Sequence, residues 1–154
     1  MPLTIVLDTS PLSIVTQRAG VAEAEACRRW LAECRRANCR ILAPAIAYYE
    51  VARELRRSGR DTGLARLEAF CALPGCYLPL TDTALRLAAS LWASARNSGR
   101  PTADPKELDC DVLLAAQALD LGLRPEELVI ATSNIGHLSQ FVRAELWSDI
   151  RPDA

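Results

Sequence analysis

Acidic side chains stand beside apolar runs at three separate places in this 154-residue sequence. Asp8 directly follows the apolar residues 3–7, and Glu50 interrupts an apolar and aromatic segment. A third group, Asp109 and Asp111, precedes a further apolar run. A carboxylate is costly to bury unless it is paired or bound to a cation, and carboxylates that converge repel one another. A hard divalent cation with oxygen ligands relieves that repulsion, so this chemistry favours Mg²⁺ or Mn²⁺.

Each of these acids also has a purely structural interpretation, which the sequence leaves open. Asp8 can cap the N-terminus of a helix, and Glu50 can be exposed and paired with Arg53. Asp109 and Asp111 suit the first turn of a helix, where the helix dipole favours acids. Successive helical residues are about 100° apart, so these two acids cannot both face one site from a regular helix. We expect one of them to act as a cap.

Hydrophobic patterning predicts that strands and helices alternate along the chain. Short apolar runs predict strands over residues 3–7, 40–43, 76–80 and 128–131, with a last extended piece near 146–147. Amphipathic spacing and turn residues predict helices from residue 11, over 21–37, 44–59, after a cap at Asp61, over 81–99, over 108–121 and, briefly, after Asn134.

This alternation implies crossover connections, and hence a mostly parallel sheet with helices on both faces. We therefore predict an α/β fold: a single three-layer α/β/α domain over residues 1–154, with a short sheet of four or five strands. In open parallel sheets, ligands bind beyond the carboxyl ends of the strands. The polar segments Asp8-Thr9-Ser10 and Thr132-Ser133-Asn134 each follow a predicted strand, so we expect them at the site.

Several of these segments together resemble the PIN-domain family, which includes the toxins of many bacterial toxin–antitoxin pairs. The segments that carry the resemblance are residues 6–12 (VLDTSPL), Glu50-Val51 with Glu54-Leu55, residues 111–116 (DVLLAA), and Thr132-Ser133-Asn134 to Leu138. In order, they are similar to the family's first strand and acid, its second acid on a helix, its third acid with an apolar tail, and its last strand element. The resemblance extends from Leu3 to about Trp147.

The resemblance implies a divalent-metal-dependent endoribonuclease that cleaves single-stranded RNA. Asp8, Glu50 and Asp111 correspond to the catalytic metal ligands, and Asp109 is a further candidate ligand. Asn134 stands where many members carry a fourth acid, and its carbonyl can serve as an auxiliary ligand or orient a water. Asp109 or Asp104 can replace the missing charge. A water activated by the metal would attack the phosphodiester in line.

We assign contacts with the substrate to four residues near these acids: Ser10, Thr132, Arg53 and Arg57. Arg53 and Arg57 belong to a cluster with Arg56 and Arg60, which is either a solvated helix face or a phosphate-binding surface. For Tyr48 and Tyr49, packing in the core is the expected role, with stacking on bases as the alternative.

The resemblance also implies protein partners. An antitoxin is a possible partner, and PIN proteins of this size commonly form homodimers. Residues 21–37 and 81–99 are the expected contributors to a dimer, because Trp30 and Trp92 are large side chains of the kind found at interfaces. Packing in the core is the alternative for both tryptophans.

Composition excludes several other classes of protein. A net charge of −1 argues against a protein that coats nucleic acid through a basic body, so RNA binding must be local. The six cysteines form no CxxC pair, and we expect buried free thiols. A single histidine, His137, excludes a zinc site with several histidines, and we expect a surface or capping role for it.

The sequence also contains no apolar run of about 20 residues, which favours a cytoplasmic protein without a membrane span. Nucleotide-binding glycine loops are absent too. The alternative function is a catalytically weak or inactive PIN fold that binds RNA or a protein partner, because Asn134 supplies one charge fewer than an acid.

Overall fold

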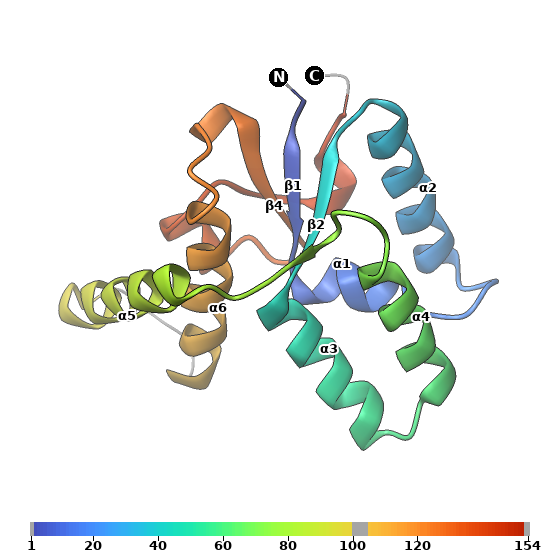
Figure 1. Cartoon of the computed structure of the whole chain (residues 1–154), viewed down its shortest axis with the longest axis horizontal. Helices are drawn as coiled ribbons and strands as arrows, with labels where there is room; N and C mark the ends of the chain where they lie inside the picture. The colour runs from blue at the N-terminus through green and yellow to red at the C-terminus, as the bar shows by residue number, and fades with distance from the viewer. Residues whose placement is uncertain (1, 100–104, 153–154) are drawn as a thin grey trace.

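The computed structural model describes residues 2–99 and 105–152, and it places five parallel strands at the centre of the molecule (Figure 1). The strands are β1 (Thr4–Leu7), β2 (Arg40–Pro44), β3 (Tyr77–Leu78), β4 (Leu128–Thr132) and β5 (Ala144–Leu146), in the order β3-β2-β1-β4-β5. The order reverses at β1, which pairs with β2 on one side and with β4 on the other. Such a reversal opens a crevice at the carboxyl ends of the central strands.

Helices lie on both faces of this sheet. They are α1 (Thr9–Ile14), α2 (Ala22–Arg36), α3 (Ala45–Arg57), α4 (Asp61–Cys71), α5 (Asp82–Asn97) and α6 (Pro105–Leu119), with three short 3-10 helices, η1 (Pro125–Glu127), η2 (Leu138–Gln140) and η3 (Trp147–Asp149). The first four pack on one side of the sheet, and α5 and α6 pack on the other (Figure 1). The described structure therefore confirms the predicted three-layer α/β/α arrangement.

Successive side chains of the central strands point to opposite faces of the sheet, so the core around these strands consists of two clusters, one on each face. In β1, Ile5 and Leu7 point into the larger cluster with α1 to α4, whereas Val6 points into a cluster with Leu114 and Ala118 of α6. All three strand residues have no exposed surface. A strand covered on both faces reads as a continuous apolar run, which is why residues 3–7 were recognisable.

Some element boundaries differ from the prediction. Helix α6 begins at Pro105 rather than at residue 108, because proline is well suited to the first turn of a helix. The strand predicted over 76–80 is reduced to the two residues of β3 at the edge of the sheet. Asp61 is the first residue of α4, and the preceding Arg60 makes no side-chain cap, so the predicted cap at Asp61 is wrong.

The cysteines and Trp30 belong to the interior. All six cysteines are free, and four of them are buried, as expected. The Trp30 ring is only 6% exposed, its Nε1 donates to the carbonyl of Ile150 at 3.1 Å, and it packs on Trp147. Trp30 is thus a core residue, and its predicted role as a dimer anchor is wrong. Among residues 2–99 and 105–152, no helix has the length and apolarity that crossing a bilayer needs.

Candidate active site

A pocket of about 320 Å³ opens at the carboxyl edge of the sheet and brings the predicted acids together. Asp8 enters it from the end of β1, Glu50 from α3, and Asp111 from α6. Asn134, from the segment after β4, also lines the pocket. Four side chains that are far apart in the sequence therefore share one pocket because they follow or face neighbouring strand ends.

Asp8 is both the cap of α1 and a member of the pocket. Its Oδ1 accepts a hydrogen bond of 2.7 Å from the backbone N–H of Thr9, and its Oδ2 accepts one of 2.7 Å from the hydroxyl of Thr132. Burial raises the pKa of Asp8 above its ordinary value, although the hydrogen bonds from Thr132 and Thr9 act in the opposite direction. The structural and functional interpretations of Asp8 therefore do not exclude each other.

Glu50 is held at the pocket by groups from two other elements. The hydroxyl of Thr9 donates to its Oε1 at 2.9 Å, and the Arg53 guanidinium lies 3.8 Å from its Oε2. The Cys110 thiol of α6 is also hydrogen-bonded to Glu50. On the same helix, Ile46, Ala47, Val51 and Ala52 are buried against the core, which leaves Glu50 at the edge of the packed face.

Asp111 carries the clearest electrostatic signature of the pocket. Burial and the negative charges of Asp8 and Glu50 raise its pKa to about 6, while His137 acts against them. Mutual repulsion among carboxylates is the condition under which binding of a cation is favourable. The expected crowding of charge is thus present at this residue.

Thr132 joins the ends of β1 and β4 below the acids, but it is buried and does not line the pocket, so its predicted contact with the substrate is wrong. Its side chain is buried, and its hydroxyl lies 2.7 Å from Oδ2 of Asp8 and 3.1 Å from the carbonyl oxygen of Asn134. The hydroxyl has a single proton to donate. The carboxylate of Asp8 is charged and closer than the carbonyl of Asn134, so the hydroxyl of Thr132 donates to Asp8. The Thr132 oxygen in turn accepts from the backbone N–H of Asn134 at 3.0 Å.

The side chain of Asn134 is partly committed to its own loop. Its Oδ1 accepts a hydrogen bond from the backbone N–H of Gly136 at 3.1 Å, and the residue is exposed at the rim. A carbonyl oxygen has two lone pairs, so one position remains for a water or another ligand.

Other predicted residues lie outside this pocket. Asp109 is exposed on α6 and Ser10 is exposed on α1, and neither lines the pocket. Arg53 does line it, whereas Arg57 pairs with Glu54 on the outer side of α3. Asp104 falls outside the described residues. The 100° step of a helix explains why α6 presents Asp111 and not Asp109.

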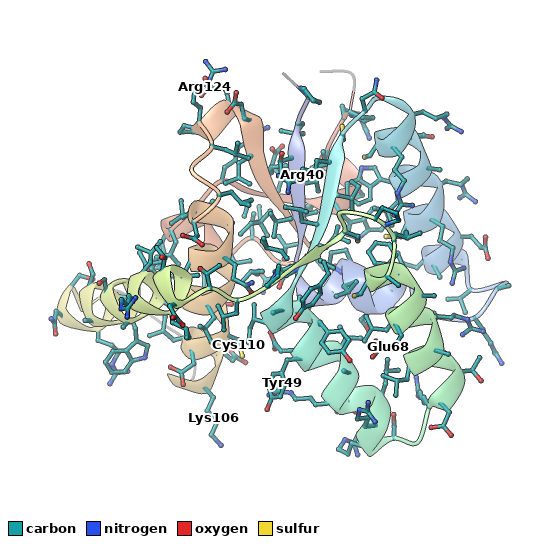
Figure 2. The ribbon with its side chains drawn as sticks, in the orientation of Figure 1. Arg40, Tyr49, Glu68, Lys106, Cys110 and Arg124 are labelled. Atoms are coloured by element: carbon teal, nitrogen blue, oxygen red, sulfur yellow. The ribbon has the colours of Figure 1, made fainter. Side chains whose placement is uncertain are left out.

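Thr9, expected at the site with Asp8, does line the pocket. Sequence reasoning missed other contributors: the lining also includes Lys106, Glu107, Cys110 and Leu138, and Figure 2 shows Lys106 and Cys110 on α6. His137, expected at the surface or as a cap, also lines it and makes no side-chain cap for η2. Glu107 lies one helical turn before Cys110 and Asp111, so all three share one face of α6. A predicted helix that began at Pro105 would have included Glu107 in this face.

A buried glutamine positions the two helices that carry the acids. The side chain of Gln117 on α6 accepts from the backbone N–H of Ile46 at 3.1 Å and donates to the carbonyl of Leu78 at 3.0 Å. Pro44 precedes α3 and has no side chain that can cap it, so Gln117 supplies the missing acceptor. In the sequence, Gln117 is a polar residue within the apolar run of α6, and this could have indicated a buried hydrogen-bonding role.

The donor set suits a hard cation, although it is not a preformed cage. Within residues 2–99 and 105–152, no three His, Cys, Asp or Glu side chains are grouped closely enough to hold a metal ion as they stand. Mg²⁺ retains several waters and binds through one or two carboxylates together with substrate phosphates. Carboxylates that line one pocket and repel one another fit that mode of binding.

A larger hollow, of about 840 Å³, lies elsewhere, between the α1–α2 connection and the α3–α4 turn. Its lining includes Arg18, Arg60 and Arg66, and Asp61 is the only carboxylate among the described residues that line it. This hollow is larger but lacks converging acids, so it is not the candidate active site. The smaller pocket contains the carboxylates of Asp8, Glu50 and Asp111 and is therefore the candidate.

No family model and no curated protein matches this chain by sequence. Solved structures do match it in three dimensions. A chain of the DNA-bound VapBC complex from Salmonella typhimurium superposes with a TM-score of 0.68 at 19% identity, covering 94% of this chain and 98% of that chain.

Two further complexes give similar values. One is VapBC2 from Rickettsia felis bound to a DNA fragment from its promoter. A chain of this complex matches with a TM-score of 0.67 at 14% identity, covering 94% of this chain and 99% of that chain. A chain of VapBC-1 from nontypeable Haemophilus influenzae matches with a TM-score of 0.66 at 17% identity, covering 96% and 100%. Identities this low show a shared fold, and this chain therefore has the PIN-like α/β/α fold.

Proposed function

We propose that this protein is a divalent-metal-dependent endoribonuclease that cleaves single-stranded RNA. The observation that carries the proposal is the convergence of Asp8, Glu50 and Asp111, from three separate elements, on one pocket at the carboxyl edge of the sheet. The raised pKa of Asp111 supports it, because a carboxylate cluster that is unfavourable by itself gains from binding a cation.

In this proposal Asp8, Glu50 and Asp111 hold Mg²⁺ or Mn²⁺. When bound, the ion supplies positive charge that stabilises the transition state and makes water a stronger nucleophile. Thr132 and Thr9 orient the carboxylates of Asp8 and Glu50 through hydrogen bonds of 2.7 and 2.9 Å. These bonds hold the acids in place before the substrate arrives.

Positive side chains at the pocket suit the anionic substrate. Arg53 and Lys106 both line it, on α3 and α6 respectively. A phosphodiester that approaches the carboxylates would otherwise meet like charge, and cationic side chains at the rim offset that repulsion. Arg53, already close to Glu50, is the residue that we assign to the phosphate.

We also propose that the protein acts as the toxin of a toxin–antitoxin pair, with a cognate antitoxin as partner. The support is the shared fold with chains of VapBC complexes, together with the resemblance of this sequence to the PIN toxins. Cytoplasmic RNA as the target and self-association into a homodimer belong to the same proposal.

The test compares two substitutions that remove the same charge at different places. Asp8→Asn should abolish Mn²⁺-dependent cleavage of mixed-sequence single-stranded RNA, because it removes a ligand while asparagine still caps α1. Asp109→Asn is the matched control on exposed α6 surface and should cleave like the wild type. In EDTA, Asp8→Asn should melt no lower than the wild type, since the raised pKa of Asp8 means that its charge is unfavourable in the fold. Full cleavage by Asp8→Asn would contradict the proposal.

A catalytically weak or inactive fold that binds RNA or a protein partner is the second candidate. It is favoured by the absence, in the described part of the chain, of a ready cluster of metal ligands and by the commitment of Asn134 Oδ1 to Gly136. Asn134→Asp distinguishes the two: added charge should tighten Mn²⁺ binding and lower the metal-free melting temperature if the pocket is a metal site. RNA binding without cleavage in wild type and Asn134→Asp alike would favour the second candidate.

A further inference from the structure

Tyr49 is the most exposed of the large hydrophobic side chains in the described part of the chain, with 55% of its surface open. The expectation that it packs in the core is wrong; Tyr48, its neighbour, is the half-buried one and bonds to Glu68. Tyr49 does not itself line the pocket that holds the acids, but its ring contacts Arg53, one turn further along α3, which does line it.

Arg53 connects this ring with the pocket. Its guanidinium lies over the Tyr49 ring, 5.2 Å from the centroid, and is also 3.8 Å from the Glu50 carboxylate. Figure 2 shows Tyr49 on the side of α3 toward α6, where Cys110 and Lys106 line the pocket. An aromatic ring thus lies against a cation that itself lines the acidic pocket.

The surroundings of Tyr49 favour a nucleic-acid base over a protein surface as its contact. Protein interfaces use large side chains inside a contiguous apolar patch from which water is excluded. Here the exposed neighbours on α3 are the charged Arg53 and Glu54. A single ring beside a phosphate-binding cation is instead the arrangement that binds single strands, through stacking on one base and attraction of the backbone.

We propose that Tyr49 stacks on an unpaired base next to the phosphodiester held in the pocket, and that this contact selects single-stranded over duplex RNA. The inference rests on the proposed ribonuclease function and adds the residue that sets its specificity. Bases in a duplex are already stacked on their neighbours and cannot reach an isolated ring, whereas those of a single strand can be splayed out.

The test measures binding in EDTA, so that no RNA is cut. The probe is a single-stranded RNA oligonucleotide that carries 2-aminopurine, a base whose fluorescence falls when it stacks on a ring. Tyr49→Ala should weaken binding by about tenfold and abolish the fluorescence change, because stacking on one base contributes about 1.4 kcal/mol or more. Tyr49→Phe keeps the ring and should retain both. An abasic oligonucleotide of equal length should bind wild type and Tyr49→Ala alike.

Trp92 provides a matched control on α5. It is also an exposed aromatic residue, 37% open, with an arginine, Arg96, 5.6 Å from its ring centroid one turn along the helix. No residue of α5 lines the acidic pocket. Trp92→Ala should therefore leave the affinity of each protomer for RNA and the fluorescence change as in the wild type, whatever its effect on self-association.

Two kinds of result would overturn the stacking proposal. If Tyr49→Ala binds both oligonucleotides like the wild type while Asp8→Asn abolishes cleavage, the ribonuclease function stands and the role of Tyr49 is wrong. If Tyr49→Phe loses affinity as much as Tyr49→Ala, the ring is not the binding element. A wild-type protein that neither binds nor cuts single-stranded RNA would remove the proposed function and this inference together.

Discussion

The hydroxyl of Thr132 donates to the carboxylate of Asp8 across 2.7 Å, although the two residues stand at opposite ends of the sequence. Their strands, β4 and β1, are hydrogen-bonded in parallel, with Leu7 opposite Ala131. Asp8 continues this pairing through its N–H, which donates to the carbonyl of Ala131 at 2.9 Å. The register of the sheet therefore sets the orientation of the first acid.

Replacing Thr132 by valine should test this relationship. Valine keeps the buried volume but removes the hydroxyl, which leaves Oδ2 of Asp8 without its donor and the N–H of Asn134 without its acceptor. We expect a loss of about 1–3 kcal/mol in the free energy of unfolding and a lower rate of RNA cleavage. Urea denaturation and a cleavage assay measure the two effects, and Thr132→Ser should restore most of both. Equal stability in the valine and serine variants would show that the hydroxyl is dispensable.

The raised pKa of Asp111 predicts how stability depends on pH in the absence of metal. The folded-state pKa of about 6 exceeds the ordinary value of 3.8, so the folded protein binds the proton more tightly than the unfolded chain does. This contribution is fully present below the ordinary pKa and is lost as pH rises through the folded value. In EDTA, the melting temperature should therefore rise as pH is lowered from about 7 to about 5.

Asp111→Asn should flatten that dependence and stabilise the metal-free protein at neutral pH. Asp8, whose pKa is also raised, contributes with the same sign and leaves a residual slope. Glu54 and Glu127, whose pKa values are lowered, act in the opposite direction only at more acidic pH. Melting curves at several pH values provide the measurement, and a wild-type melting temperature that falls over this window would contradict the assignment.

The arginines on and beyond α3 should contribute unequally to RNA binding. Arg53 lines the pocket, whereas Arg57 is paired with Glu54 away from it. Arg53→Ala should reduce the slope of log affinity against log salt by about 0.7, the value for one phosphate contact on a single strand. Arg57→Ala and Arg56→Ala should change it less. Salt titrations of binding measure these slopes. Equal slopes in all variants and the wild type would show that none of these arginines contacts a phosphate and that the cluster is a solvated helix face.

Self-association, if it uses α5, should depend on Trp92. On this helix Leu85 is 46% exposed and Trp92 is 37% exposed, while Ala84, Ala88 and Ala95 are buried. We expect a dimer mass by light scattering at micromolar concentration and a monomer mass for Trp92→Glu, because a buried unpaired charge is unfavourable at an interface. Leu73→Glu, at an exposed position between α4 and β3, is the control and should remain dimeric. A monomeric wild type would refute the prediction.

The sequence by itself determined the order of the elements and the main acids. The buried run of β1 ends at Asp8, and the continuous apolar pattern of a doubly covered strand makes that end visible without tertiary information. Glu50 was recognisable because a carboxylate in an apolar helix needs an explanation. Both signals are local, so periodicity and residue type were sufficient.

Only the tertiary structure decided which residues meet. Asp109 and Asp111 are equivalent in composition and differ by two helical steps, so the packing of α6 on the sheet determines which one faces the pocket. The exposure of Tyr49 against the partial burial of Tyr48, the burial of Trp30 but not of Trp92, and the bonds from Gln117 to Ile46 and Leu78 arise in the same way. These features depend on the distances between helices that are remote in the sequence, and a local pattern carries no information about such distances.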